Sequence, residues 1–160
     1  MQAKKILVIS DTHRHREAWQ AALARAGSVD MVFHLGDHVS DAVAMADALA
    51  GKAKVVAVRG NCDFSGDAAE EEVVVCGHRF WLTHGHNYGV KYSLQRLCYA
   101  AEEKQVDAVL FGHTHVPTLE YYGGILVLNP GSVGEPRGRK ATFALLEVSP
   151  EGIFPKMVEV

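Results

Sequence analysis

The stretch that decides the fold is Lys4–His13, KKILVISDTH, in which a short apolar run ends directly on charged and imidazole side chains. Its apolar half, Lys4–Ser10, predicts a buried β-strand because it is short, continuous and rich in β-branched residues. Polar residues follow five more apolar runs in the same way. These runs are Met31–Leu35 before Asp37, Lys54–Val58 before Asn61, Val73–Thr83 before His84, Ala108–Phe111 before His113, and Ile125–Leu128 before Asn129.

Three helices are predicted between these strands, because apolar residues recur at i, i+3, i+4 and i+7. One face carries Trp19, Ala22, Leu23 and Ala26, a second carries Ala42, Met45, Ala46 and Leu49, and a third carries Leu94, Leu97, Cys98 and Ala101. Ser40 is the expected N-cap of the second helix and Gly51 its stop. The early order β-α-β-α-β indicates parallel strands covered by helices.

The second half of the chain adds hairpins to this pattern. Cys76-Gly77-His78 and Gly123-Gly124 separate apolar runs and predict tight turns. Two further strands are expected over Thr142–Val148 and Phe154–Val160. This is too many strands for one open sheet with a helix on each side. We therefore expect an α/β fold in which two mixed β-sheets pack as a sandwich flanked by helices, in a single domain over residues 1–160.

Composition excludes several classes of protein. The chain has 160 residues, 48% apolar and 22% charged, which is ordinary for a soluble globular domain. Its three cysteines form no CxxC pair, which indicates a reducing compartment, the cytoplasm, and argues against a disulfide framework. The first apolar run is too short for a signal peptide or a membrane span. A net charge of -3 gives no electrostatic reason to expect long nucleic acid as a partner.

The polar residues after the strands are expected to meet at one edge of the domain, since ligands of α/β sheets bind beyond the carboxyl ends of the strands. The candidate metal ligands are Asp11, His13, Asp37, Asn61, His84, His113 and His115. Oxygen and imidazole donors without thiolate suit Mn, Fe, Co, Ni or Zn and disfavour an all-oxygen calcium site. The set is too large for one ion and fits two ions that share a carboxylate. Such a pair clamps the phosphate of an in-line displacement. Taken singly, Asp11 or Asp37 could simply cap the turn after its strand.

The ordered series D-x-H, G-D, G-N-x-D, H-G-H and G-H-x-H resembles the calcineurin-like metallophosphoesterase superfamily, over the range Asp11 to Ser132. The short length, the G-N-C-D form and the closing N-P-G-S resemble its small bacterial and archaeal phosphodiesterase branch. That branch is also similar to the small, catalytically weak subunit of the eukaryotic retromer coat. The resemblance implies a four-layer αββα fold and a hydroxide nucleophile bound to two divalent metal ions, with manganese the first expectation.

The same resemblance implies a division of the ligands. The first ion would be held by Asp11, His13, Asp37 and His115, and the second by Asp37, Asn61, His84 and His113, so that Asp37 bridges. Two further residues are candidates for catalytic roles. His86 is assigned to phosphate contact or to support of the ligands. Asp63 is expected to support a ligand, with His13 as the suggested partner.

Other polar residues near these motifs have less defined roles. Cys62 stands where many superfamily members carry a histidine, and we interpret it as a small neutral residue lining the site. A cysteine-phosphatase loop would need arginine six residues later, where Ala68 stands. The basic run Arg137-Gly138-Arg139-Lys140 could reach substrate phosphates or a partner subunit, although solvated surface charge is the default for such a run. The histidines outside the series, His15, His34, His38 and His78, are expected to be structural or solvated.

The leading hypothesis is a cytoplasmic, metal-dependent phosphodiesterase, rather than a monoesterase, that acts on a small phosphate ester. The alternative is a retromer-subunit-like interaction scaffold whose metal site is weak or vestigial. Completeness of the ligand set favours the enzyme, since a scaffold is free to lose ligands. A nuclease on long DNA or RNA is disfavoured by the net charge and by the lack of room for a capping domain. No membrane partner is expected, and a homo-oligomer is left open.

Overall fold

The fold consists of two mixed five-stranded β-sheets, as a computed structural model of residues 2–63, 68–137 and 139–160 shows. The first sheet has the order β10 (Gly152–Glu159), β9 (Thr142–Ser149), β1 (Lys4–Ile9), β2 (Met31–His34) and β3 (Lys54–Ala57). The second has the order β4 (Glu70–Val75), β5 (His78–Thr83), β6 (Ala108–Leu110), β8 (Ile125–Asn129) and β7 (Thr118–Tyr122). Strands β1, β2 and β3 are parallel, and so are β5, β6 and β8.

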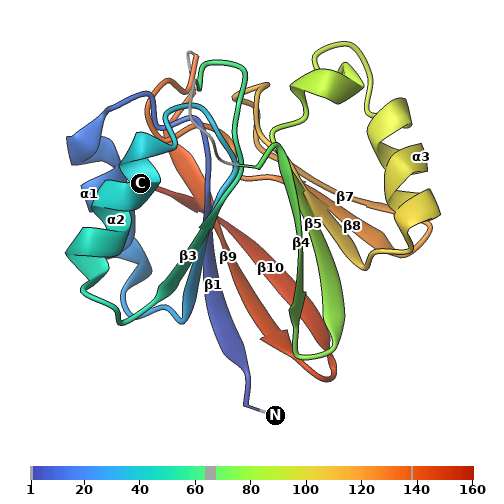
Figure 1. Ribbon diagram of the computed structural model, residues 1–160, viewed down its shortest axis with the longest axis horizontal. Helices are drawn as coiled ribbons and strands as arrows, with labels where there is room; N and C mark the ends of the chain where they lie inside the picture. The colour runs from blue at the N-terminus through green and yellow to red at the C-terminus, as the bar shows by residue number, and fades with distance from the viewer. Residues whose placement is uncertain (1, 64–67, 138) are drawn as a thin grey trace.

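The helices form the two outer layers (Figure 1). Helices α1 (Arg16–Ala26) and α2 (Ser40–Leu49) cover the outer face of the first sheet, whereas α3 (Gln95–Lys104) covers the outer face of the second. A short 3₁₀ helix, η1 (His86–Tyr88), precedes α3. The sandwich of two mixed sheets flanked by helices is therefore confirmed.

Strand periodicity explains why the layers form. In β1, Ile6 and Val8 point between the two sheets, where they join a core that includes Phe80 of the second sheet. Leu7 and Ile9 point to the opposite face and pack with residues of α1 and α2. Because successive strand side chains alternate between faces, a fully apolar strand such as β1 can fill two cores at once.

Some element boundaries differ from those expected. The run Val73–Thr83 forms two strands around the predicted turn, and the first of them begins at Glu70. Ser40 is the first residue of α2 rather than its N-cap, and the cap position makes no side-chain hydrogen bond. Instead, the carboxylate of Asp63, from a distant loop, accepts hydrogen bonds from the N–H groups of His38 and Val39 at this end of the helix. Helix α2 ends at Leu49, and Gly51 follows two residues later in a left-handed conformation.

None of the helices in the described ranges has the length and apolar character that crossing a membrane requires.

Truncation of Leu128 should measure the contribution of the core between the sheets. This side chain is fully buried, so Leu128→Ala should lower the free energy of unfolding by about 2–5 kcal/mol. The matched control is Leu119→Ala on β7, because Leu119 lies directly opposite Leu128 in the register but is 40% exposed. Urea denaturation of both variants is the measurement. Equal losses would contradict the layer arrangement described above.

Candidate metal centre

The ends of five strands, β1, β2, β3, β5 and β6, bring the candidate ligands together. On the first sheet, the Asp11 N–H donates to the Gly36 carbonyl at 3.0 Å, so the loops after β1 and β2 lie side by side. On the second sheet, the Gly112 N–H donates to the His84 carbonyl at 3.0 Å, which joins the loops after β5 and β6. The two pairs of loops meet where the His113 N–H donates to Asp11 Oδ2 at 3.1 Å. The centre therefore spans both sheets.

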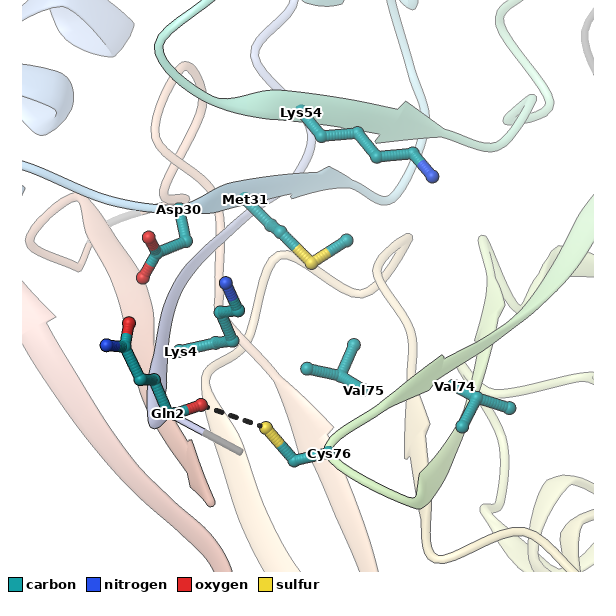
Figure 2. Close-up of a pocket in the computed structure, with 8 residues that line it drawn as sticks. All are labelled: Gln2, Lys4, Asp30, Met31, Lys54, Val74, Val75 and Cys76. Carbon is teal, nitrogen blue, oxygen red and sulfur yellow. Dashed lines mark hydrogen bonds between the residues drawn. The ribbon is translucent and has the colours of Figure 1, made fainter. Parts of the chain in front are cut away.

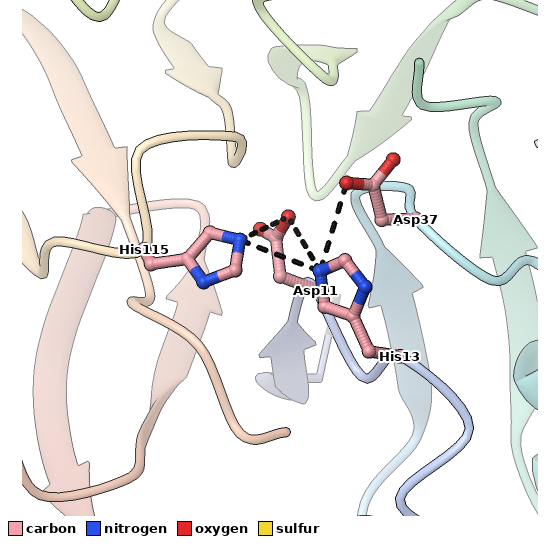
Figure 3. A group of neighbouring side chains, drawn as sticks. All are labelled: Asp11, His13, Asp37 and His115. Carbon is pink, nitrogen blue, oxygen red and sulfur yellow. Dashed lines mark hydrogen bonds and ion pairs between the residues drawn. The ribbon is translucent and has the colours of Figure 1, made fainter. Parts of the chain in front are cut away.

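A first group of ligand atoms comes from Asp11, His13, Asp37 and His115 (Figure 3). One nitrogen or oxygen of each lies within 4.8 Å of the others. His115 Nε2 lies 3.3 Å from Asp11 Oδ1, and His13 Nε2 lies 3.7 Å from Asp37 Oδ2. The two imidazole nitrogens are 3.4 Å apart and face the same small volume. Two carboxylates and two imidazoles around one point form a donor set that suits a transition-metal ion.

A second group of ligand atoms comes from Asp37, His84 and His113, again within 4.8 Å of one another. His84 Nε2 lies 3.4 Å from Asp37 Oδ1 and 3.1 Å from Asn61 Oδ1. The amide oxygen of Asn61 therefore stands beside this group. Asp37 belongs to both groups and presents a different oxygen to each, Oδ2 to His13 and Oδ1 to His84. The structure thus brings together every ligand expected from the sequence and places Asp37 between the two groups.

Backbone carbonyls orient two of the imidazole rings. His84 Nδ1 lies 2.7 Å from the Leu35 carbonyl, and His115 Nδ1 makes a short hydrogen bond to the Glu135 carbonyl. A carbonyl can only accept, so each Nδ1 carries the proton. In the neutral ring the lone pair is then on Nε2, which is the atom that faces the carboxylates. Both rings are held in the tautomer that binds metal through Nε2.

Both carboxylates of the centre are ionised despite their burial. Burial raises the pKa of Asp11, but the contacts with His115 and His13 outweigh it and hold that pKa well below its ordinary value. The pKa of Asp37 is likewise lowered, since His84 outweighs the effect of burial. Asp11 Oδ1 is buried and accepts no hydrogen bond from the described residues. The nearest imidazole nitrogens, those of His115, His13 and His84, lie 3.3–3.8 Å from this oxygen without forming a hydrogen bond to it. A buried, ionised oxygen without a hydrogen-bond donor is costly unless a cation satisfies it, so the site fits a metal ion.

The histidines differ in their affinity for protons. The neighbouring Asp11 raises the pKa of His13, and the pKa of His84 is raised because Asp37 and Asp11 outweigh its burial. The pKa of His113 falls to about 4, through burial and through the positive charges of His84 and Lys91. Without metal, protons on His13 and His84 thus offset part of the carboxylate charge.

The loops hold these side chains in strained backbone conformations. Left-handed φ angles occur at Asp11 (54°), His13 (47°), Asp37 (61°), His113 (70°) and His115 (63°). Such angles are uncommon outside glycine and tend to cluster at functional sites. Two glycines allow the close packing that results. A Cβ atom at Gly60 would overlap the Asp37 carboxylate, and one at Gly112 would overlap the Ser10 hydroxyl.

Asp63 supports the loop after β2 rather than His13. Its carboxylate accepts hydrogen bonds from the N–H groups of Asp37 (2.9 Å), His38 (2.7 Å), Val39 (2.9 Å) and Gly60 (2.9 Å). The suggested contact with His13 was therefore wrong, because the nearest donors of this carboxylate are backbone groups that a sequence motif does not reveal. Asp63 fixes the backbone from which the Asp37 side chain projects.

Cys62 and His86 flank the second group of ligands. The Cys62 N–H donates to Asp37 Oδ1 at 3.0 Å, while burial and the nearby Asp37 raise the pKa of its thiol to about 11. Cys62 is therefore a neutral thiol at physiological pH. The ring of His86 lies 5.4 Å from that of His84 and 6.0 Å from that of His113, between centroids. Its Nδ1 is buried and has no hydrogen-bond partner among the described residues.

Two further polar groups support the centre: His34, which was expected to be structural or solvated and is structural, and Ser132. His34 is fully buried, which lowers its pKa to about 4, and its Nδ1 accepts from the Gly36 N–H at 3.2 Å. Its Nε2 lies 3.1 Å from the Thr12 hydroxyl, so the ring ties the loop after β1 to that after β2. The Ser132 hydroxyl donates to the Asp11 carbonyl at 2.9 Å. A lone histidine in the apolar run MVFHL was the only signal for the first of these roles.

The remaining histidines are structural or surface groups. His78 Nε2 lies 2.8 Å from the Ser149 carbonyl, and exposed His15 lies 3.9 Å from Glu135. The ring of His38 packs against that of His13, with 5.2 Å between centroids. Arg137 of the basic run lines a cavity beside the centre, whereas Gly138 of that run lies outside the described residues.

A cavity of about 600 Å³ lies at the amino ends of β1, β2 and β3, whereas the candidate ligands follow the carboxyl ends of these strands. Figure 2 shows the residues that line it. Its lining includes Lys4, Met31 and Lys54, at the starts of β1, β2 and β3, together with Cys76 of the β4–β5 turn. The Cys76 thiol donates to the Gln2 carbonyl there at 3.5 Å. None of the candidate ligands lines this cavity.

Comparison with known proteins identifies similar sequences and similar structures. The family model of the calcineurin-like phosphoesterase superfamily domain matches residues 5–151. The chain is 39% identical over 144 residues to the probable metallophosphoesterase YsnB of Bacillus subtilis, covering 88% of this chain and 82% of YsnB. It is 38% identical over 104 residues to the phosphodiesterase YfcE of Escherichia coli, covering 59% of this chain and 53% of YfcE. Its structure resembles that of Vps29 from Entamoeba histolytica, with a TM-score of 0.78 at 25% identity, over 98% of this chain and 99% of that chain.

Added metal should stabilise the chain more at pH 8 than at pH 6. Because the pKa values of His13 and His84 are raised above about 6.5, protons occupy both rings at pH 6 and a metal ion must displace them. The same protonated rings stabilise the metal-free fold at low pH, and this contribution is lost as the pH rises. The increase in Tm on adding Mn²⁺, measured at both pH values, should therefore be smaller at pH 6. The control is His78→Gln, which removes a histidine from the other end of β5 and should leave the difference unchanged. An equal increase at both pH values would contradict the assignment of these ligands.

Proposed function

The chain belongs to the calcineurin-like phosphoesterase superfamily and is a metal-dependent phosphodiesterase, and we propose that it hydrolyses small phosphate esters with two divalent ions bound at this centre. The observation that carries the proposal is the position of Asp37, whose two oxygens face two separate groups of ligand atoms. A carboxylate placed in this way is suited to bridge two ions.

The residues of the centre have distinct roles under this proposal. Asp11, His13, Asp37 and His115 would hold one ion, and Asp37, Asn61, His84 and His113 the other. When bound, such a pair lowers the pKa of water so that hydroxide can attack phosphorus, and it neutralises charge on the phosphate. Asn61 offers a neutral oxygen, so it would add a ligand without reducing the positive charge of the pair.

The protein side chains around the ligands would orient the substrate and the loops. The half-buried ring of His86 lies next to the second group, which supports a contact with a phosphate oxygen. Asp63 keeps the Asp37 loop in its strained conformation through hydrogen bonds from the N–H groups of three residues of that loop, Asp37, His38 and Val39. The thiol of Cys62 is a weak donor and would give little help to a departing alkoxide.

Several finer points belong to the same proposal. Manganese is the first ion to test, although Fe, Co, Ni and Zn suit the same donors. The net charge of -3 supports a small substrate over long nucleic acid. Three cysteines without a CxxC pair support a cytoplasmic location.

The alternative function is an interaction scaffold with a weak or vestigial metal site. The likeness of fold to Vps29 is the observation in its favour. The buried, ionised oxygen of Asp11, which has no hydrogen-bond donor among the described residues, favours the enzyme, because a scaffold gains nothing from this arrangement and would be more stable without it.

Substitution of the bridging carboxylate tests the proposal directly. Asp37→Asn should reduce metal content to less than two ions per chain and lower kcat/KM on bis(4-nitrophenyl) phosphate by more than about 100-fold, because both ions lose the same charged ligand. Elemental analysis and steady-state kinetics with Mn²⁺ are the measurements. The matched control is Asp47→Asn, at an exposed position of α2, which should retain both ions and full activity. A wild-type protein that never binds more than a trace of metal, or whose turnover survives EDTA, would overturn the proposal.

Cys62→Ser separates hydroxide attack from thiolate attack. The pKa of this thiol is about 11, so the sulfur stays protonated and the serine variant should keep kcat/KM within about threefold of the wild type. The measurement is hydrolysis of the same aryl diester by protein with both ions bound. Loss of turnover in the metal-replete variant would instead identify the sulfur as the nucleophile.

A further inference from the structure

A cavity of about 410 Å³ lies beside the metal centre and is not used by the proposed reaction. Its lining combines apolar side chains with two cations. They are Val90, Leu94, Phe111 and Val116 together with Lys91 and Arg137. Two threonines and one carboxylate, that of Glu120, complete the lining. The volume falls within the range of small-molecule binding sites.

The walls of this cavity are built by the loops that carry the metal ligands. Thr114 lies between His113 and His115 in the chain, and Phe111 comes two residues before His113. On the other wall, Val90 packs against Gly85. A Cβ atom added at Gly85 would lie 3.1 Å from the Val90 side chain. Gly85 is the residue between His84 and His86. A phosphate at the metal centre would therefore lie next to the cavity.

The apolar part of the lining suits a ring or a hydrocarbon group. Phe111 is fully buried, Val90 is nearly so, and Val116 is 36% exposed. Phe111 and Val90 therefore form the buried floor of the cavity, and the apolar surface that a ligand can cover belongs to Val116 and half-buried Leu94. Covering that surface is favourable.

The charged part of the lining suits an anion. Lys91 and Arg137 come from segments far apart in the sequence, one after η1 and the other from the basic run near the C-terminus. Both are exposed, and together they exceed the single negative charge of Glu120. Guanidinium and ammonium groups bind carboxylate and phosphate through charge-assisted hydrogen bonds.

We propose that this cavity binds one ester arm of the diester and selects an arm that joins an apolar ring to an anionic group. The inference rests on the proposed function, because the arm reaches the cavity only when the phosphate lies at the metal centre. Lys91, Arg137 and Val116 then determine substrate specificity, while the metal ligands determine the rate of attack.

Three diesters with the same leaving group, 4-nitrophenolate, test this assignment. Their other arms are methyl, phenyl and 4-carboxyphenyl, so the bond that breaks is constant and only the bound arm differs. With Mn²⁺-replete protein, kcat/KM should rise about tenfold from methyl to phenyl through apolar contact. It should rise about fivefold more for 4-carboxyphenyl through the two cations. The gains should appear in KM, because an arm remote from the reacting bond binds ground state and transition state alike.

Variants of the lining residues test which side chains cause the preference among the three diesters. The double variant Lys91→Gln and Arg137→Gln should abolish the preference for 4-carboxyphenyl over phenyl and keep that for phenyl over methyl. Val116→Asp should remove both preferences, because it places a charge on the apolar wall. The matched control is Arg139→Gln, which removes the same charge two residues from Arg137, outside the cavity lining, and should change neither ratio.

The outcomes separate this inference from the proposed function. If the wild type fails to hydrolyse even the methyl diester, the proposed function is wrong and the inference falls with it. Hydrolysis of all three diesters at one kcat/KM would overturn the inference alone. So would a double variant that keeps the full preference for the carboxyphenyl arm.

Discussion

Two ionised carboxylates, Asp11 and Asp37, lie buried on adjacent loops, and the arrangement around them follows from their charge. Removing an ionised group from water costs several kcal/mol even after the protein relaxes, and two like charges also repel each other. The histidines compensate in part, as the raised pKa values of His13 and His84 show. The compensation is incomplete, because Asp11 Oδ1 has no hydrogen-bond donor among the described residues. A metal cation would satisfy this oxygen.

Packing of the two sheets is what assembles the ligands. Asp11, Asp37 and Asn61 follow strands of the first sheet, whereas His84, His113 and His115 follow strands of the second. The loops of the two sheets are in close contact where they meet, since a Cβ atom at Gly36 would lie only 2.7 Å from His84 Nδ1. Neither group of ligand atoms is complete within one sheet. Metal binding and the docking of the sheets should therefore stabilise each other, since ions that bind only the folded state raise its stability.

The loops where the two sheets meet form both the metal centre and the neighbouring cavity that we propose to determine substrate specificity. The loops after β5 and β6 carry His84, His113 and His115 on one side and wall the neighbouring cavity on the other. Backbone hydrogen bonds, the buried ring of His34 and the carboxylate of Asp63 hold the left-handed residues in their strained conformations. Side chains on rigid strand ends are placed more precisely than side chains on free loops, which suits an in-line displacement. The protonated thiol of Cys62 is a poor nucleophile, which is consistent with the proposed attack by hydroxide.

The sequence by itself determined the strands and the candidate ligands. Runs such as Ile6–Ile9 have the length and composition of buried strands, and a polar residue directly after a strand must lie at the edge of its sheet. Only the tertiary structure decided what surrounds the ligands. The Glu135 carbonyl orients His115 and the Asp63 carboxylate holds the backbone at Asp37, although each pair is 20 residues or more apart. The position of Arg137 beside the centre was equally hidden, because a solvated and a site-lining arginine look alike in sequence. Backbone donors and acceptors are the same at every position, so their partners become known only when the loops are placed in space.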